Sequence, residues 1–278
     1  MSKSIKSRRN HAYSFIRLFL SDVREQILKH WYYFVLLVPL IVYQWVSLRD
    51  LSIFSGLSGQ IGFMDLIIYL FYGEKEYIPQ VSPFQVKIEF LTMQVLLAYV
   101  TAYYPVRDLS VRGRQIFIRV GGNVTWWYSK CLWLILTVVL YYLGIWLTAA
   151  ILTGGWKMLP DINLLSVYGE IYQLGKTADY MIYCLMLPVI ASLSVLMIQM
   201  LLSILTAPVY GFLVVVLQQL VSFYFYSPLL PGNYQMFNRL ELARESGITA
   251  LPSFLFCGVL IIVCMVIGAV YMKKRDIL

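Results

Sequence analysis

Six apolar runs, each close to the length of a membrane-spanning helix, dominate this sequence of 278 residues. The runs are Trp31–Leu48, Phe90–Val106, Cys131–Thr153, Met181–Leu205, Val209–Tyr226 and Phe254–Met272. About 20 residues of α-helix cross the hydrocarbon layer of a bilayer, which is roughly 30 Å thick. Backbone groups find no water inside lipid, and the runs lack the alternation of barrel strands, so each run is expected to be helical. The sequence predicts an all-α polytopic membrane protein with six transmembrane helices.

Composition supports the same class of protein. A chain that is 60% hydrophobic, 16% aromatic and 13% charged has more apolar surface than one water-soluble core can bury. The first 14 residues are polar and basic, and the first long apolar run begins only at Trp31. A cleaved signal peptide is therefore not expected, and residues 1–278 are expected to form one transmembrane domain.

The basic residues are divided unequally between the two sides that six spans would create. One side would hold residues 1–30, 107–130 and 273–278, with 15 basic and four acidic residues, whereas the other would hold seven basic and ten acidic residues. Cytoplasmic segments keep the excess of lysine and arginine, so both termini are predicted to be cytoplasmic. Topology and attraction to anionic lipid account for the net charge of +8, and nucleic-acid binding is not needed to explain it.

Cysteine and histidine usage indicates no metal site and no structural disulfide. The four cysteines fall within predicted spans, without a CxxC pattern or a cluster with histidine; they are Cys131, Cys184, Cys257 and Cys264. The two histidines, His11 and His30, lie in the predicted cytoplasmic segment before the first span. This placement removes the usual metal ligands and general bases from the membrane.

Two short motif matches do not indicate function. Gly175-Lys176-Thr177 resembles the end of a phosphate-binding loop, but Glu170 occupies the position of the required upstream glycine. Asn123-Val124-Thr125 fits the glycosylation pattern, but the distribution of charge places it in the cytoplasm.

The N-terminal segment 11–30 has the pattern of an amphipathic helix. Apolar residues recur at Ile16, Phe19 or Leu20, Val23 and Ile27, with arginines on another face. The pattern predicts a helix in the membrane interface, although an ordinary cytoplasmic extension of the first span has the same pattern. Trp31 would then mark the aromatic belt at the bilayer surface.

Polar and small residues form stripes at helical spacing within four of the spans. One interpretation is helix packing, in which small residues allow close approach and glutamines bond between helices. The other is a translocation path, whose candidate residues are Gln94, Thr101, Gln199, Gln218, Gln219 and Ser222. No ionisable residue is predicted in mid-membrane, which disfavours ion coupling and intramembrane catalysis. If the protein moves a substrate, the energy is expected to come from another subunit.

The basic segment 107–130 lies between the second and third spans. Asp108 or Ser110 is expected to cap a short helix after Pro105. Its apolar contacts, between the arginines, would come from Leu109, Val111, Ile116 and Ile118. Interfacial positions are expected for the aromatic residues that return the chain to the membrane, which are Trp126, Trp127 and Tyr128. Such a helix could enter a groove of a partner, and the alternative is a loop that contacts lipid.

The run "YPVRDLSVRGRQIFIRVGGNVTWWYSKCLW" and the segment "PGNYQMFNR", together with six spans and an interfacial N-terminal helix, resemble membrane subunits of ABC-2 type ATP-binding-cassette exporters. The likeness is greatest to small Gram-positive permeases for export of, or immunity to, bacteriocins and other antimicrobial peptides. The resemblance implies a dimer of two permease subunits, identical or different, in the bacterial plasma membrane. ATP and Mg²⁺ would bind separate cytoplasmic ATPase subunits, and the permease itself would be non-catalytic.

The resemblance also implies roles for two connecting segments. The loop between the second and third spans would dock on the ATPase through the residues Asp108, Leu109, Val111, Arg112, Gly113, Arg114, Gln115, Ile116 and Arg119. Residues 228–252 occupy the place of an outer re-entrant hairpin, but Arg239, Glu241, Arg244 and Glu245 argue against full burial of that hairpin.

A third segment, Ile61–Tyr72, is too short for a confident span and contains Asp65. It is expected to lie on the outer surface or to dip into the membrane.

The leading functional hypothesis is an ATP-driven exporter of an amphipathic peptide or another hydrophobic substrate. The alternative from another class is a membrane sensor or scaffold that recruits a cytoplasmic partner through its basic loop. The partner discriminates between them, because only the exporter requires an ATPase with Walker motifs. A membrane enzyme is the third possibility, and the absence of histidine and of paired acids within the spans disfavours it.

Overall fold

The computed structural model describes residues 15–29, 31–56, 61–74, 77, 80, 86–111, 123–168 and 175–274. Within these ranges the chain is helical and forms no β-strand beyond a bridge between Leu240 and Ile248. The prediction of an all-α fold is therefore confirmed for the described part of the chain.

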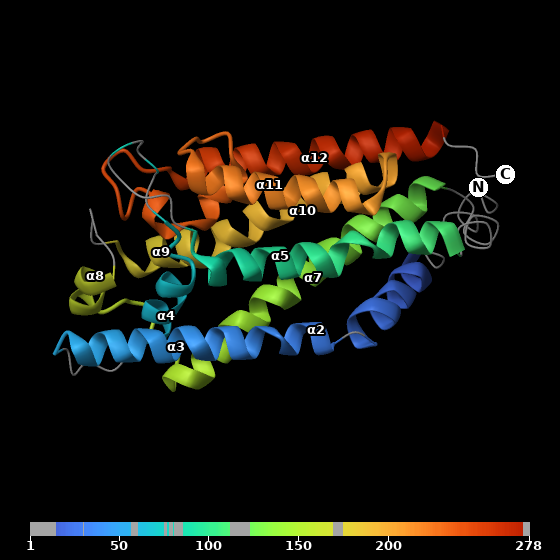
Figure 1. Cartoon of the computed structure of the whole chain (residues 1–278). Helices are drawn as coiled ribbons and strands as arrows, with labels where there is room; N and C mark the ends of the chain where they lie inside the picture. Colours follow the sequence, from blue (N-terminus) through green and yellow to red (C-terminus); the bar gives the residue numbers. More distant parts are fainter. Residues whose placement is uncertain are drawn as a thin grey trace, which may run out of the picture.

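The long helices run along a common axis (Figure 1). They are α3 (Leu37–Phe54), α5 (Ile88–Ala102), α7 (Asn123–Thr153), α10 (Leu187–Leu205), α11 (Pro208–Tyr224) and α12 (Ala250–Lys274). Short elements lengthen two of them: α2 (Tyr32–Val35) precedes α3, and α9 (Thr177–Tyr180) with the π-helical turn η2 (Met181–Met186) precedes α10. Before α2, residues 15–22 are α-helical and continue into the π-helical turn η1 (Val23–Leu28).

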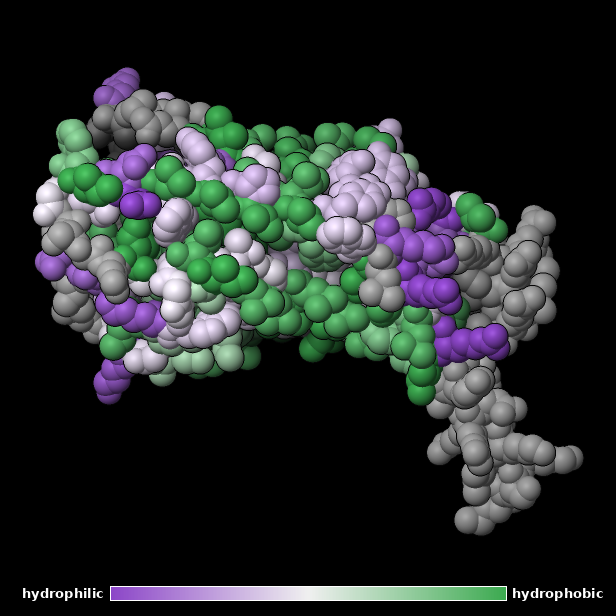
Figure 2. All heavy atoms as spheres, turned by 90° about the horizontal axis from the view of Figure 1, so that it is seen from below, coloured by the Kyte–Doolittle hydropathy of each residue, from purple (hydrophilic) through white to green (hydrophobic). Residues whose placement is uncertain are grey.

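Four helical stretches in the described chain are long and apolar enough to cross a membrane. They are Tyr32–Phe54, Asn123–Thr153, Thr177–Leu205 and Ala250–Lys274. The other two predicted spans are shorter, since α11 has 17 residues and α5 has 15. The four stretches define a helical membrane protein, and on the face in Figure 2 a band of hydrophobic side chains separates two more hydrophilic ends. Six spans remain a prediction.

The second predicted span is broken near its end. Helix α5 stops at Ala102, Tyr103 is bent, and a new helical stretch covers residues 104–111. Pro105 explains the break, because proline has no amide hydrogen to donate four residues back and its ring disfavours helical geometry in the preceding turn.

Helix α10 is central and contacts α5, α7, α11 and α12. The chain reverses between α10 and α11 through Thr206 and Ala207, and Pro208 begins α11. Gly211 lies so close to α10 that a Cβ atom at this position would stand 2.2 Å from Ser203 Oγ. Small residues thus set the separation of these two helices, as is typical of helix pairs in membranes.

Helix α4 (Phe63–Leu70) is buried under other parts of the chain at the end of the bundle that also holds α8 (Ile162–Tyr168) (Figure 1). Asp65 Oδ2 accepts a hydrogen bond of 2.8 Å from the Gly62 amide, and Oδ1 accepts one of 2.6 Å from the Asp161 amide. Burial raises the pKa of Asp65, although these amide bonds act in the opposite direction. The helix within Ile61–Tyr72 is enclosed by protein, which corrects the expectation of an exposed place on the outer surface. A position of this segment within the membrane stays a prediction.

The segment after α11 folds into the bundle. Its two 3₁₀ turns are η3 (Pro231–Gln235), which packs against α10, α11 and α12, and η4 (Phe237–Arg239). The Phe237 amide donates a hydrogen bond of 2.8 Å to the Phe71 carbonyl. Gly73 allows this close approach, since it has a φ of 74° and a Cβ atom there would lie 2.6 Å from Met236 Cβ.

Arg239 is buried, with 1% of its surface exposed, whereas Glu241 and Arg244 are half-buried and Glu245 is exposed. The segment is therefore buried only in part, and Arg239 alone departs from the expectation. Its Nε donates to the Glu74 carbonyl at 3.2 Å and one terminal nitrogen donates to the Phe223 carbonyl at 3.1 Å. Backbone carbonyls therefore replace much of the water that a guanidinium requires.

Candidate functional site

One end of the bundle gathers three segments that are distant in the sequence: residues 15–29, residues 104–111 and the start of α7 (Figure 1). The end of α12 is also there, since Asn123 Nδ2 donates a hydrogen bond of 3.1 Å to the Met272 carbonyl. The described basic residues of these segments, apart from Lys130, are exposed; they are Arg17, Arg24, Lys29, Arg107, Lys273 and Lys274. The basic segments identified in the sequence therefore meet at one physical end.

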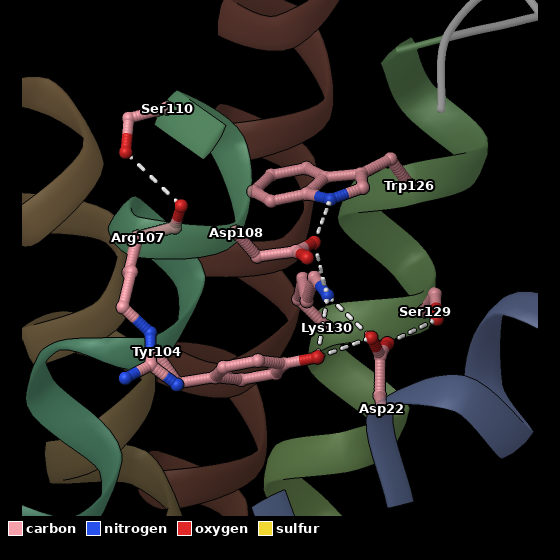
Figure 3. A network of polar contacts seen from close by, with 8 residues as sticks. All are labelled: Asp22, Tyr104, Arg107, Asp108, Ser110, Trp126, Ser129 and Lys130. Carbon is pink, nitrogen blue, oxygen red and sulfur yellow. Dashed lines mark hydrogen bonds and ion pairs between the residues drawn. The ribbon is translucent and has the colours of Figure 1, made fainter. Parts of the chain in front are cut away.

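Lys130 differs from these surface cations because its side chain is completely buried. Its Nζ atom lies 2.5 Å from Asp22 Oδ1, 2.7 Å from Asp108 Oδ2 and 3.3 Å from the Tyr104 hydroxyl (Figure 3). One ammonium group thus joins two buried carboxylates from separate segments.

The carboxylates have further donors. Asp22 accepts hydrogen bonds from the Tyr104 hydroxyl at 2.6 Å and from Ser129 Oγ at 2.8 Å. Asp108 Oδ2 accepts one of 2.9 Å from Trp126 Nε1. We call these residues the Lys130 cluster: Asp22, Tyr104, Asp108, Trp126, Ser129 and Lys130. Buried charges are tolerated where they are paired and hydrogen-bonded, and the cluster meets both conditions.

Helical spacing explains how these side chains meet. Leu18 and Asp22 are four residues apart and point to the same face of the N-terminal helix. Tyr104 and Asp108 have the same spacing on residues 104–111, and Trp126 stands four residues before Lys130 on α7. Each of the three segments therefore presents one short face to the cluster.

The structure corrects the sequence-based view of residues 107–130. Residues 104–111 are helical, and α7 begins at Asn123 rather than near Cys131, so much of the predicted loop is helix. Asp108 does not begin a helix as a cap, since it lies within one and pairs with Lys130. Leu109 is buried and Val111 is 73% exposed. The remaining predicted docking residues lie outside the described residues; they are Arg112, Gly113, Arg114, Gln115, Ile116 and Arg119.

The tryptophan pair contacts protein. Trp126 and Trp127 have no exposed surface, which corrects their expected place at the lipid interface. Trp127 Nε1 donates a hydrogen bond of 2.9 Å to the Met265 carbonyl of α12. By contrast, Trp31 is 62% exposed and Tyr128 is 40% exposed, as contact with an interface requires.

The six candidate path residues are mostly engaged between helices. Gln199 Nε2 donates to the Ala98 carbonyl at 2.8 Å and lies 3.4 Å from Thr101 Oγ1. Gln94 Oε1 accepts a bond of 3.3 Å from Ser192 Oγ. Helix packing accounts for these contacts without a translocation path.

A second group of polar contacts reaches the inserted turn η3. Gln235 donates to Ser192 Oγ at 3.0 Å and accepts a bond of 2.9 Å from Gln219. Gln218 Nε2 donates to Ser222 Oγ at 3.2 Å within α11. The turn is thus tied to both α10 and α11 through Gln235, a residue that sequence reasoning did not single out.

Sequence reasoning also missed Asp22, Tyr104 and Ser129 and treated Lys130 as a loop cation. One signal was available for Asp22, since an acid beside the apolar residues Phe19 and Val23 of an amphipathic helix needs a basic partner. No comparable signal identifies Tyr104 or Ser129, because their roles depend on which helices pack together.

The remaining motifs supply no second site. Gly175-Lys176-Thr177 lies at the start of α9, away from the Lys130 cluster, and the four cysteines are free and buried. Among the described residues, no group of three or more histidine, cysteine, aspartate or glutamate side chains could hold a metal ion.

No model of a known protein family matches the chain, and no curated protein matches it.

Proposed function

We propose that this chain is the membrane subunit of an ATP-driven exporter, and that its segment 107–130 carries movement from a separate cytoplasmic ATPase. The Lys130 cluster is the observation that supports the proposal. Asp108 stands near the start of the segment and Lys130 at its end, and their side chains meet at 2.7 Å. The segment is therefore closed at its base by a buried ion pair.

Because of this ion pair, a force on the segment would act on both of the helices that flank it. A partner that moves residues 112–122 would pull on residues 104–111 and on α7 together, because the ion pair joins their ends. Asp22 adds the N-terminal helix to the same unit. Packed helices can respond to such a load as rigid bodies, which is one of the established modes of allosteric transition.

In this proposal the basic end of the bundle faces the cytoplasm, with six spans and both termini inside. Two permease subunits, identical or different, form the membrane part in a bacterial plasma membrane. ATP and Mg²⁺ belong to the ATPase, and an amphipathic peptide is the favoured substrate on resemblance alone.

Purification from native membranes in mild detergent, followed by mass spectrometry, tests the proposal. Four proteins are compared: the wild type, Gly113→Pro, the double variant Arg112→Glu with Arg119→Glu, and Lys273→Glu as an exposed basic control outside the segment. We expect a stoichiometric cassette ATPase with the wild type and with Lys273→Glu, loss of that ATPase in the double variant, and loss of transport in Gly113→Pro.

Two results would contradict this assignment. Unchanged transport and ATPase recruitment in both segment variants would remove the proposed role of residues 107–130. Recovery of a kinase or a synthase, with no ATPase, would favour the sensor or scaffold instead.

A further inference from the structure

A pocket of about 160 Å³ lies between the N-terminal helix and residues 104–111. The described residues that line it are Glu25, Tyr104, Arg107, Asp108 and Val111. Sites that enclose a whole small-molecule ligand usually measure about 300–1,000 Å³. This pocket therefore suits one polar group of a larger molecule, with the rest of that molecule outside.

The lining carries charges of both signs. Arg107 is exposed, and its guanidinium presents a planar set of donors that matches the oxygens of a phosphate. Glu25 and Asp108 supply carboxylates, and Glu25 also accepts a bond of 2.8 Å from Lys29. Asp108 contacts Lys130 and Trp126 through Oδ2, so these contacts leave its Oδ1 atom unused. The pocket is complementary to a ligand that has both an anionic and a cationic group.

Exposed aromatic residues border this end of the bundle. Trp31 and Tyr32, at the start of the first span, are 62% and 47% exposed. Tyr103 is 50% exposed and lies four residues before Arg107, whose amide bonds to the Tyr103 carbonyl. Exposed tryptophan and tyrosine of this kind gather at the depth of lipid headgroups. The pocket therefore lies where a headgroup is available in high local concentration.

We infer that this pocket binds the headgroup of a phospholipid that carries both a phosphate and an ammonium group. The phosphate contacts Arg107, and the ammonium group contacts Glu25 and Asp108. A headgroup that is only anionic could contact Arg107, but it would make no contact with Glu25 and Asp108, which have room for a second cation beside Lys29 and Lys130. A free phosphate ion lacks the acyl chains that the adjacent membrane would retain.

The test uses the purified full-length protein in detergent after removal of bound lipid. Phosphatidylethanolamine and phosphatidylglycerol with identical acyl chains are added in equal amounts, and native mass spectrometry measures how much of each lipid the protein retains. We expect a preference for phosphatidylethanolamine of about tenfold, the ratio that corresponds to one charge-assisted contact. Because the measurement needs no ATPase, its outcome is independent of the proposed function.

Three variants locate the binding. Arg107→Gln should lower retention of phosphatidylethanolamine by about tenfold, since it removes the phosphate contact. Glu25→Gln should reduce the preference between the two lipids, and Lys274→Gln, an exposed cation at the same end outside the pocket, should behave as the wild type. Equal retention of both lipids by the wild type, or unchanged retention in Arg107→Gln, would overturn the inference.

Discussion

Lys130 and Asp108 approach to 2.7 Å between Nζ and Oδ2, although 21 residues separate them in the sequence. Lys130 is fully enclosed, and its Nζ also lies over the rings of Tyr104 and Trp126, at 4.5 and 5.4 Å from their centroids. This pair closes the base of the segment whose docking on an ATPase we propose.

Lys130→Met is predicted to destabilise the protein by about 3–5 kcal/mol, because it leaves the Asp22 and Asp108 carboxylates buried without their cation. Thermal unfolding in detergent would measure the loss as a lower midpoint. Lys29→Met is the matched control, since the Lys29 side chain is 56% exposed and an exposed pair contributes at most about 1 kcal/mol. Combining Lys130→Met with Asp22→Asn and Asp108→Asn should recover part of the stability. Equal midpoints for Lys130→Met and Lys29→Met would show that the ion pair is not a structural element.

Gly268→Ala is predicted to destabilise the contact between α7 and α12. A Cβ atom at Gly268 would lie 2.2 Å from Trp127 Cζ2, and overpacking of this kind costs about 1–3 kcal/mol. Gly258→Ala on the same helix is the control, because no atom lies within 4 Å of a Cβ atom there. We expect a lower unfolding midpoint for the first variant and an equal or higher one for the second. Identical effects of the two substitutions would mean that the close contact does not limit packing.

Gln235 and Ser192 are predicted to be energetically coupled, since Gln235 Nε2 donates to Ser192 Oγ at 3.0 Å in a buried site. A double-mutant cycle with Gln235→Leu and Ser192→Ala should give a coupling free energy of about 0.5–3 kcal/mol. The variant Gln235→Leu should also speed hydrogen exchange in residues 231–239, because η3 loses its ties to α10 and α11. Strict additivity of the two substitutions would argue against this hydrogen bond.

Lys87 is predicted to make stability depend on pH above neutrality. The residue precedes α5, and its Nζ donates to the Tyr69 carbonyl at 2.6 Å. Burial lowers the pKa of Lys87 to about 8, and the charges of Glu74 and Glu89 only partly oppose this shift. Below about pH 8 both the folded and the unfolded chain carry the proton, and the cost of burying the charge is fully present.

Between that pKa and the ordinary lysine value of 10.5, the unfolded chain binds more protons than the folded one. The contribution of Lys87 to stability therefore rises with pH in this window, by at most about 1.4 kcal/mol per pH unit. The difference between the unfolding midpoints at pH 7.5 and pH 9.5 should be smaller in Lys87→Met than in the wild type. Lys157→Met, at an exposed lysine, should leave the difference unchanged. A wild-type difference that persists in Lys87→Met would assign the effect to other groups.

The positions of the long helices along the chain were predictable from the sequence, because each apolar run marks a helix through its own residues. The predicted run Met181–Leu205 lies within the stretch Thr177–Leu205, and Phe254–Met272 lies within α12. The predicted helix ends were wrong where the end of a helix depends on contacts with other segments of the chain. Helix α7 extends back to Asn123 because Trp126, Ser129 and Lys130, which are polar or interfacial by type, are enclosed by other helices.

The candidate site was less predictable than the fold. Sequence reasoning identified the segment 107–130 and named Asp108, but it assigned Lys130 to a solvated loop. A lysine beside tryptophans at a span end has the same local pattern whether it faces lipid headgroups or a carboxylate. Only the position of Asp22, 108 residues earlier in the chain, distinguishes these cases.

The sequence by itself determined that this chain is helical, strongly apolar and asymmetric in charge, because each of these properties is a sum over neighbouring residues. The tertiary structure alone decided which charges are surface cations and which are buried partners. It placed Arg107 at the surface, enclosed Lys130 between Asp22 and Asp108, and folded Arg239 inside the bundle. A side chain is buried when other segments of the chain cover it. Long-range packing decides which segments do so, and the local sequence does not encode that packing.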